Sequence, residues 1–292
     1  MKKLLIACAA MLLLLLPAGA MCEDEDDVLR VETLAARNDI ETVLSRVGSL
    51  SVNAVYYDGE GAESLALSSY AYRVGGELRI AYEDSAGNVR ALGSGEGCGI
   101  DGATGKPYVV AFIDGAFEEM FSEMRHSLLV NIDGNETISR FEEVDDTTVL
   151  IVTEEPVAGR GHGYTEGTLV TEHLLEKDTL ILKSLTESLR TEDGAEKILC
   201  RAEVVRGARF KFPDSLKALA EPNLPTRAIY IVVYAGTEGE KTLLAEYPEC
   251  AYLEVAVRDG YGVFADAEGT LPASLAAIAS DEDSVVYVIA AK

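Results

Sequence analysis

The chain contains no tryptophan, and its three histidines and five cysteines are scattered. His126, His162 and His173 show no His-x-x-x-His spacing, and no Cys-x-x-Cys pair is present, so the usual zinc patterns are absent. A Gly-x-Ser-x-Gly elbow for a nucleophilic serine is also missing. We therefore predict no catalytic residues, no cofactor and no metal site, and expect a protein that is not an enzyme.

Positive charge is scarce. Lys and Arg number 25 against 50 Asp and Glu, which makes the formal net charge −25. Such a surface repels phosphate backbones and anionic lipid head groups. We therefore expect no nucleic-acid partner, and no membrane adhesion through charge.

Cysteine pairing is left open. Beyond the first twenty residues the cysteines are Cys22, Cys98, Cys200 and Cys250, all far apart in the sequence. Four cysteines allow three full pairings, and an oxidising compartment would permit any of them. Nothing in their spacing selects one pairing over buried free thiols.

The N-terminus has the layout of a secretory signal. Lys2 and Lys3 precede an apolar run over residues 4–16, and Ala18-Gly19-Ala20 supplies a small-residue exit. The apolar run is too short for a comfortable membrane span. We predict a signal peptide over residues 1–20, cleavage after Ala20, and an extracytoplasmic location in a bacterium, either secreted or in the cell envelope.

Cys22 offers an alternative. It follows Gly19-Ala20-Met21, where a bacterial lipoprotein would carry its lipid-modified cysteine, although Met21 is bulkier than the usual preceding residue. Lipidation at Cys22 would be the one reason to expect membrane attachment. An acidic leader over residues 21–26 would begin the mature chain.

The remaining sequence reads as a helix followed by many short strands. Apolar residues at spacings of three and four predict a helix over Asp27–Val47, which Gly48 would end. Period-two patterns then predict an antiparallel meander, and Asp193-Gly194 marks the clearest hairpin. The glycine-rich residues 93–105 are expected to form a loop. The predicted strands are 51–57, 66–74, 77–82, 89–92, 109–113, 137–142, 147–153, 167–175, 179–189, 196–206, 208–212, 229–235, 241–246, 252–257 and 285–290.

A second helix is predicted over residues 116–129. Phe117, Met120, Phe121 and Met124 recur at helical spacing on it. This stripe is either plain core or the lining of an apolar ligand pocket, and methionine would suit apolar ligands of varied shape. These four residues are our candidate ligand-binding residues.

Two proline residues mark a candidate domain boundary. Pro222 and Pro225 lie in a short segment, residues 221–226, that reads as a linker between β-rich regions. We predict a main domain over residues 27–220 and a small β-rich domain over residues 227–292, with a short helix over residues 272–279.

The main domain resembles the lipoprotein-carrier (LolA/LolB-like) superfamily. Three features carry the likeness: the helix ending at Val47 followed by a meander from Ser51, the strand over residues 77–82, and the hairpin over residues 179–206 followed by Arg209–Pro213. The resemblance implies an α+β fold, mostly antiparallel β, with a curved open sheet or half-barrel and helices on its concave face.

The C-terminal stretch resembles the small β repeats of bacterial surface proteins. The likeness rests on residues 230–234, on the turn within residues 260–270 and on residues 284–288. It implies a β-grasp-like or surface-repeat-like unit that serves as a spacer or an interaction module.

These likenesses leave three functions to compare. The first is a non-enzymatic carrier or binding protein, whose partner would be a lipid or other apolar ligand. The second is a cell-surface interaction module with a filled core, whose partner would be a cell-envelope protein. A hydrolase comes third. An apolar cavity favours the first, a filled core the second, and a polar cleft with convergent carboxylates the third.

Overall fold

The computed structural model describes residues 37–113, 115–126, 128, 136–157, 167–221, 223–233, 241–273 and 284–290. The chain forms two compact units. One comprises residues 132–197 together with the chain up to Asp39, and the other comprises residues 40–131 and 198–292. The predicted signal peptide, the acidic leader, Cys22 and the first part of the predicted helix 27–47 lie outside the described residues.

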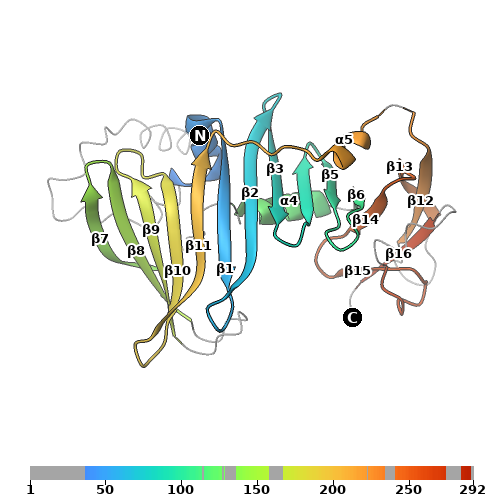
Figure 1. Cartoon of the computed structure of the whole chain (residues 1–292). Coiled ribbons are helices and arrows are strands. Elements are labelled where there is room, and N and C mark those ends of the chain that lie inside the picture. Colours follow the sequence, from blue (N-terminus) through green and yellow to red (C-terminus); the bar gives the residue numbers. More distant parts are fainter. Residues whose placement is uncertain are drawn as a thin grey trace, which may run out of the picture. The chain divides into compact units, whose positions relative to one another are not determined.

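The first unit is an antiparallel meander of four strands, β7-β8-β9-β10 (Figure 1). Their buried side chains include Ile151, His173, Leu175 and Leu182. A tight turn over Thr191–Ala195 follows β10, and Gly194 in it has a φ of 82°. The hairpin turn predicted at Asp193-Gly194 is therefore confirmed. The strands are β7 (Thr137–Asp145), β8 (Thr148–Pro156), β9 (Thr168–Glu176) and β10 (Leu182–Arg190).

The predicted helix 27–47 is interrupted near its end. Asn38 and Asp39 are not helical, and α3 covers Ile40–Val47. The buried Asn38 side chain accepts a hydrogen bond from the backbone N–H of Leu182 and donates one to the carbonyl of Leu180, both at 2.9 Å. The prediction of one continuous helix was wrong because these long-range bonds hold Asn38 outside helical geometry. Gly48, with a φ of 76°, ends α3 as predicted.

The main sheet of the second unit has the order β14-β6-β5-β4-β3-β2-β1-β11. Neighbours pair antiparallel except for β14, which pairs with β6 in parallel. The strands are β1 (Ser49–Tyr57), β2 (Glu63–Val74), β3 (Glu77–Asp84), β4 (Val89–Gly93), β5 (Glu96–Ile100), β6 (Pro107–Phe112), β11 (Glu196–Arg206) and β14 (Tyr252–Ala256).

Strand β5 corrects the prediction of a loop over residues 93–105. It pairs with both β4 and β6, so it is an internal strand of the sheet. Its glycines make room for large neighbours: a Cβ on Gly99 would clash with the Tyr108 side chain, and one on Gly97 would crowd Leu92 and Phe112. Composition suggested a loop, whereas these glycines allow close packing across a strand.

Two faces of this sheet carry different side chains. Ala81, Ala91, Cys98, Val109 and Leu253 are paired in turn from β3 to β14 and so form one row on one face. Their neighbours in sequence form the opposite row. We call the first face the α5 face, because Leu216 of α5 (Asp214–Ala218) packs with Ala81 and Ala91.

The opposite face meets α4 (Ala116–His126), whose Ala116 and Met120 pack with Tyr108 and Ala256. We call it the α4 face.

Helix α5 was missed by the sequence analysis, and a strand was predicted wrongly over residues 208–212. Only β-like alternation marks that stretch, and a five-residue helix has too few turns to show a period.

The remaining strands form a separate four-stranded sheet of order β13-β12-β16-β15. Its two central strands, β12 and β16, pair in parallel. The strand predicted at residues 252–257 as part of this small unit is instead β14 of the main sheet. The domain boundary predicted at residues 221–226 therefore stays a prediction. Strand β14 follows this segment in the sequence, yet it pairs with β6, which precedes the segment. The strands are β12 (Thr226–Val233), β13 (Lys241–Pro248), β15 (Tyr261–Phe264) and β16 (Ser284–Ala290).

The coarse fold prediction is confirmed: the protein is mostly antiparallel β, with a large open sheet and few helices. Helices on a concave face and a surface-repeat-like C-terminal unit stay predictions. Within the described residues, no helix combines the length and the apolar character that crossing a bilayer requires.

Candidate functional site

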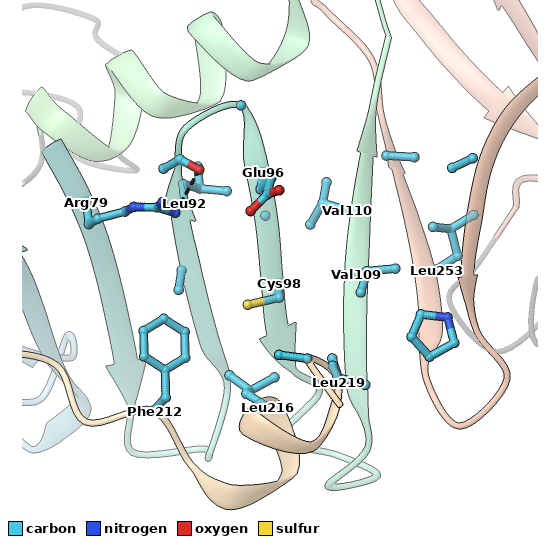
Figure 2. A pocket seen from close by; sticks show the side chains of 18 of the residues that line it. Arg79, Leu92, Glu96, Cys98, Val109, Val110, Phe212, Leu216, Leu219 and Leu253 are labelled. Carbon is cyan, nitrogen blue, oxygen red and sulfur yellow. Dashed lines mark hydrogen bonds between the residues drawn. The ribbon is translucent and has the colours of Figure 1, made fainter. Parts of the chain in front are cut away.

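A pocket of about 860 Å³ lies on the α5 face of the main sheet (Figure 2). Strands β4, β5, β6 and β14 supply its floor, and Arg79 of β3 lies at one end. Helix α5 and the residues beside it supply one wall, and β13 supplies another. Its size is within the range of sites that bind small molecules. The lining residues are Tyr72, Arg79, Ala91, Leu92, Gly93, Gly95, Glu96, Gly97, Cys98, Val109, Val110, Ala111, Phe212, Leu216, Lys217, Leu219, Ala220, Ala245, Glu246, Pro248 and Leu253.

The floor is apolar because of the strand register. Ala91, Cys98, Val109 and Leu253 are successive partners across four strands. Side chains alternate between the faces of a sheet, so this register brings small and medium apolar groups into one row. No single segment of the sequence contains this row.

Helix α5 supplies an apolar wall. Leu216 and Leu219 are three residues apart, so they lie on one side of the turn, and both pack with the cluster that contains Cys98. Phe212 precedes the helix, and its ring makes an edge-to-face contact with Phe210 at 5.0 Å between centroids. Lys217, at the exposed rim of the pocket, forms an ion pair with Asp214 of the same helix. The helix is thus amphipathic, with its apolar side toward the pocket.

Arg79 brings a cation to one end of the pocket. Figure 2 shows its side chain extending from β3 across β4 toward Glu96. This path is open because residue 93 is glycine, where a Cβ would clash with the Arg79 side chain. Arg79 donates a hydrogen bond from Nη1 to the carbonyl oxygen of Gly93 at 3.0 Å, and its side chain is 29% exposed. Gly93 therefore holds the guanidinium group in a defined place above the floor.

The thiol in the floor is not an activated nucleophile. The pKa of Cys98 is raised to about 11, mainly by burial and also by the Glu96 carboxylate, while Arg79 opposes the shift. Burial likewise raises the pKa of Tyr72, although Arg79 opposes it. Both groups stay protonated at neutral pH, so the pocket floor presents neutral side chains.

On the α4 face, an ion pair ties β14 to β4 behind the pocket floor. Arg90 donates two hydrogen bonds to the Glu254 carboxylate, at 2.7 and 2.8 Å, and one to the Tyr108 hydroxyl at 3.2 Å. Burial lowers the pKa of Arg90, but the Glu254 carboxylate, together with Tyr108 and Tyr82, raises it overall. Burial raises the pKa of Tyr108 to about 12. Gly99, between Arg90 and Tyr108 in the register, leaves space for this contact.

The predicted stripe on α4 lies on this second face, and none of its residues lines the pocket. The Phe117 and Phe121 rings stack at 5.3 Å between centroids. Met120 packs with Tyr108 and Val110, and its sulfur accepts a hydrogen bond from Arg90 at 3.2 Å. Met124 is buried. A ligand role for the stripe stays a prediction, and Phe212, Leu216 and Leu219 are the lining residues that sequence reasoning missed.

The other candidate groups are dispersed. Within the described residues, Cys98, Cys200 and Cys250 form no disulfide, while Cys22 lies outside those residues. His173 is buried, with Nε2 at 3.1 Å from the Thr153 hydroxyl. His162 and the side chain of His126 are not described. In the described part of the chain, no three or more His, Cys, Asp or Glu side chains group in a way that could hold a metal ion.

Comparisons with known proteins give distant structural likenesses. No family model matches the chain, and no curated protein matches it. The structure is similar to that of LprF from Mycobacterium bovis, with 12% identity over 63% of this chain and 97% of that chain, and a TM-score of 0.34. It is also similar to a LolA superfamily protein from Nitrosomonas europaea, with 9% identity over 65% of this chain and 97% of that chain, and a TM-score of 0.27. Because both TM-scores are below 0.5, membership of the LolA/LolB-like superfamily stays a prediction.

Proposed function

We propose that this chain is a non-enzymatic carrier or binding protein that holds an apolar ligand in the pocket beside α5. One observation carries the proposal: the sheet, α5 and β13 border an open pocket of about 860 Å³ that is lined mainly by apolar side chains. Burying an alkyl chain there would contribute about 0.8 kcal/mol per methylene. A surface interaction module with a filled core would have no use for such a space.

The raised pKa of Cys98 also supports binding rather than chemistry. A thiol that titrates at about 11 is almost wholly protonated at neutral pH, so it would not attack an acyl group. Glu96, Lys217 and Glu246 line the pocket and are exposed at its rim, where water screens their charges. The arrangement favours holding a ligand without reacting with it.

A tryptophan reporter tests the proposal directly, because the chain has no tryptophan of its own. In the mature protein, Leu219→Trp places an indole in the pocket wall. Energy transfer from it to a dansyl-labelled undecanoic acid should saturate at micromolar probe concentrations. Cys98→Phe, which fills the floor, should weaken binding of the probe to the otherwise wild-type protein at least tenfold.

The matched control is Val74→Phe, which adds the same ring at an exposed position outside the pocket lining. It should leave probe binding unchanged. If the reporter shows no transfer, and calorimetry with the wild type shows no heat of binding, the interaction-module function replaces the carrier function.

We propose export as the setting for this function, with cleavage after Ala20. The Lys2–Lys3 end, the apolar run and the Ala-x-Ala exit support it. An intact mass beginning at Met21 is the expected result. A diacylglycerol mass on Cys22 would establish the lipoprotein alternative instead.

A further inference from the structure

Arg79 is the one half-buried cation among the residues that line the pocket. The other lining cation, Lys217, is exposed and already paired with Asp214 at 2.8 Å. Arg79 is held across Gly93, so its guanidinium does not have to be ordered when a ligand arrives. The end of the pocket at β3 therefore differs chemically from the apolar floor that runs from β4 to β14.

The Arg79 guanidinium retains capacity for a ligand. It has five N–H donors, and one of them is used by Gly93. Its nearest carboxylate, Glu77, is 4.0 Å away, 62% exposed, and also accepts a hydrogen bond from the Ser94 hydroxyl. Glu96 faces the same end but is exposed, so water can solvate it when it moves aside.

The dimensions match a molecule with one long apolar part. From the Arg79 guanidinium, held at Gly93 of β4, the floor crosses to β14, which is three inter-strand spacings, or about 14 Å. A chain laid across the strands would bury its methylenes on Ala91, Cys98, Val109 and Leu253, and would place its end group at Arg79. A planar guanidinium pairs best with a planar carboxylate, through two parallel hydrogen bonds.

From this geometry we propose that the ligand of the α5 pocket is a free long-chain carboxylate, with its head group paired to Arg79 and its chain on the β4–β14 floor. This inference rests on the proposed function and adds the chemical class and the orientation of the ligand. Arg79 is then the residue that determines specificity. The proposal also runs against the overall charge: a chain of net charge −25 would by itself favour a cationic ligand.

Three probes of equal chain length test the proposal on the full mature protein at physiological salt. They are dodecanoate, 1-dodecanol and dodecyltrimethylammonium, each measured by displacement of the neutral dye Nile red. Dodecanoate should bind tightest. Arg79→Gln should weaken the binding of dodecanoate about tenfold, as expected for loss of a charge-assisted hydrogen bond, and leave the binding of 1-dodecanol unchanged. The unchanged alcohol also shows that the variant is folded.

Further variants sharpen the test. Arg79→Lys keeps the charge and loses the planar fork, so it should recover part of the affinity for dodecanoate. Glu96→Gln removes a competing carboxylate and should strengthen dodecanoate binding. Arg140→Gln, the matched control, removes an exposed cation that is paired with Glu172 and does not line the pocket, and it should change nothing.

Two kinds of failure can be told apart. If 1-dodecanol and dodecanoate bind equally well, if Arg79→Gln weakens both by the same factor, or if dodecyltrimethylammonium binds tightest, the head-group assignment is overturned and the pocket function stands. If none of the three probes displaces Nile red or binds by calorimetry, the proposed function falls together with this inference.

Discussion

The ion pair between Arg90 and Glu254 gives the sharpest test of how the pocket floor is held together. The two side chains are 20% and 21% exposed, and they join β4 to β14 across two intervening strands. Arg90→Met would remove both hydrogen bonds and leave the Glu254 carboxylate with little access to water. Breaking a fully buried pair costs about 3–5 kcal/mol, and the residual exposure here lowers the expected cost to about 2–3 kcal/mol.

The chain offers a matched control. Arg140 and Glu172 also pair across strands, at 3.3 Å, but are 52% and 48% exposed. Arg140→Met should cost about 0–1 kcal/mol, because water replaces the lost contact. The loss of stability caused by Glu254→Gln should fall between those of Arg90→Met and Arg140→Met, since the amide still accepts a hydrogen bond from Arg90. The double variant Arg90→Met/Glu254→Met should cost less than the sum of the two single methionine variants, because no charge is left behind.

Urea unfolding followed by circular dichroism measures these costs, and amide hydrogen exchange locates them. Exchange should rise in β14 and in its partner β6, because β14 is an edge strand of its sheet. The reasoning is refuted if Arg90→Met costs no more than Arg140→Met, or if exchange in β14 is unchanged. Probe binding should fall in parallel, since Leu253 of β14 lines the pocket.

Four further predictions follow from buried groups. Gly99→Ala should destabilise the protein by about 1–3 kcal/mol, because its Cβ would clash with the Val89 carbonyl oxygen and the Tyr108 side chain; a neutral effect on urea unfolding would contradict this packing. Alkylation of Cys98 by iodoacetamide should be slower than that of the exposed Cys250 at pH 8 and should rise about tenfold per pH unit until near pH 11, as peptide mass spectrometry would show; a plateau below pH 9 would exclude a raised pKa. Burial lowers the pKa of His173 from 6.5 to about 4. The neutral imidazole therefore makes its full contribution to stability, about 3 kcal/mol, above about pH 6.5, and this contribution is lost as the pH falls to 4. The difference in unfolding free energy between wild type and His173→Leu should shrink over that pH window. If the α4 stripe is plain core, Met120→Ala should cost about 2 kcal/mol and leave binding of the dansyl probe intact, whereas weaker binding with little loss of stability would favour the stripe as a ligand site.

Local patterns in the sequence were enough to predict strands β1 to β4 and the turn that follows β10. Alternation marks β1 to β4, and Asp193-Gly194 marks the turn, because strand period and turn chemistry depend on residues within a few positions of each other. The composition also placed the chain among acidic proteins with a real core. The predicted signal segment is a local pattern of the same kind.

Tertiary structure decided the features that depend on distant residues. Asn38 breaks the first helix through bonds to residues 142 and 144 positions away. Strand β5 exists because its glycines let Leu92, Phe112 and Tyr108 pack close to it, which composition alone presented as a loop. The parallel pairing of β14 with β6 could not be inferred from the sequence, because the strand pattern of residues 252–257 fits the main sheet and the small sheet equally well.

The pocket is the clearest case. Its floor is a row of residues drawn from four strands, and its wall is a five-residue helix with no detectable period. The sequence pointed to the apolar stripe of α4, which packs on the other face, because helical spacing is visible in sequence and strand register is not. Register is set by which strands pair and by how far each is shifted, so only the folded sheet places Arg79 at the end of an apolar floor.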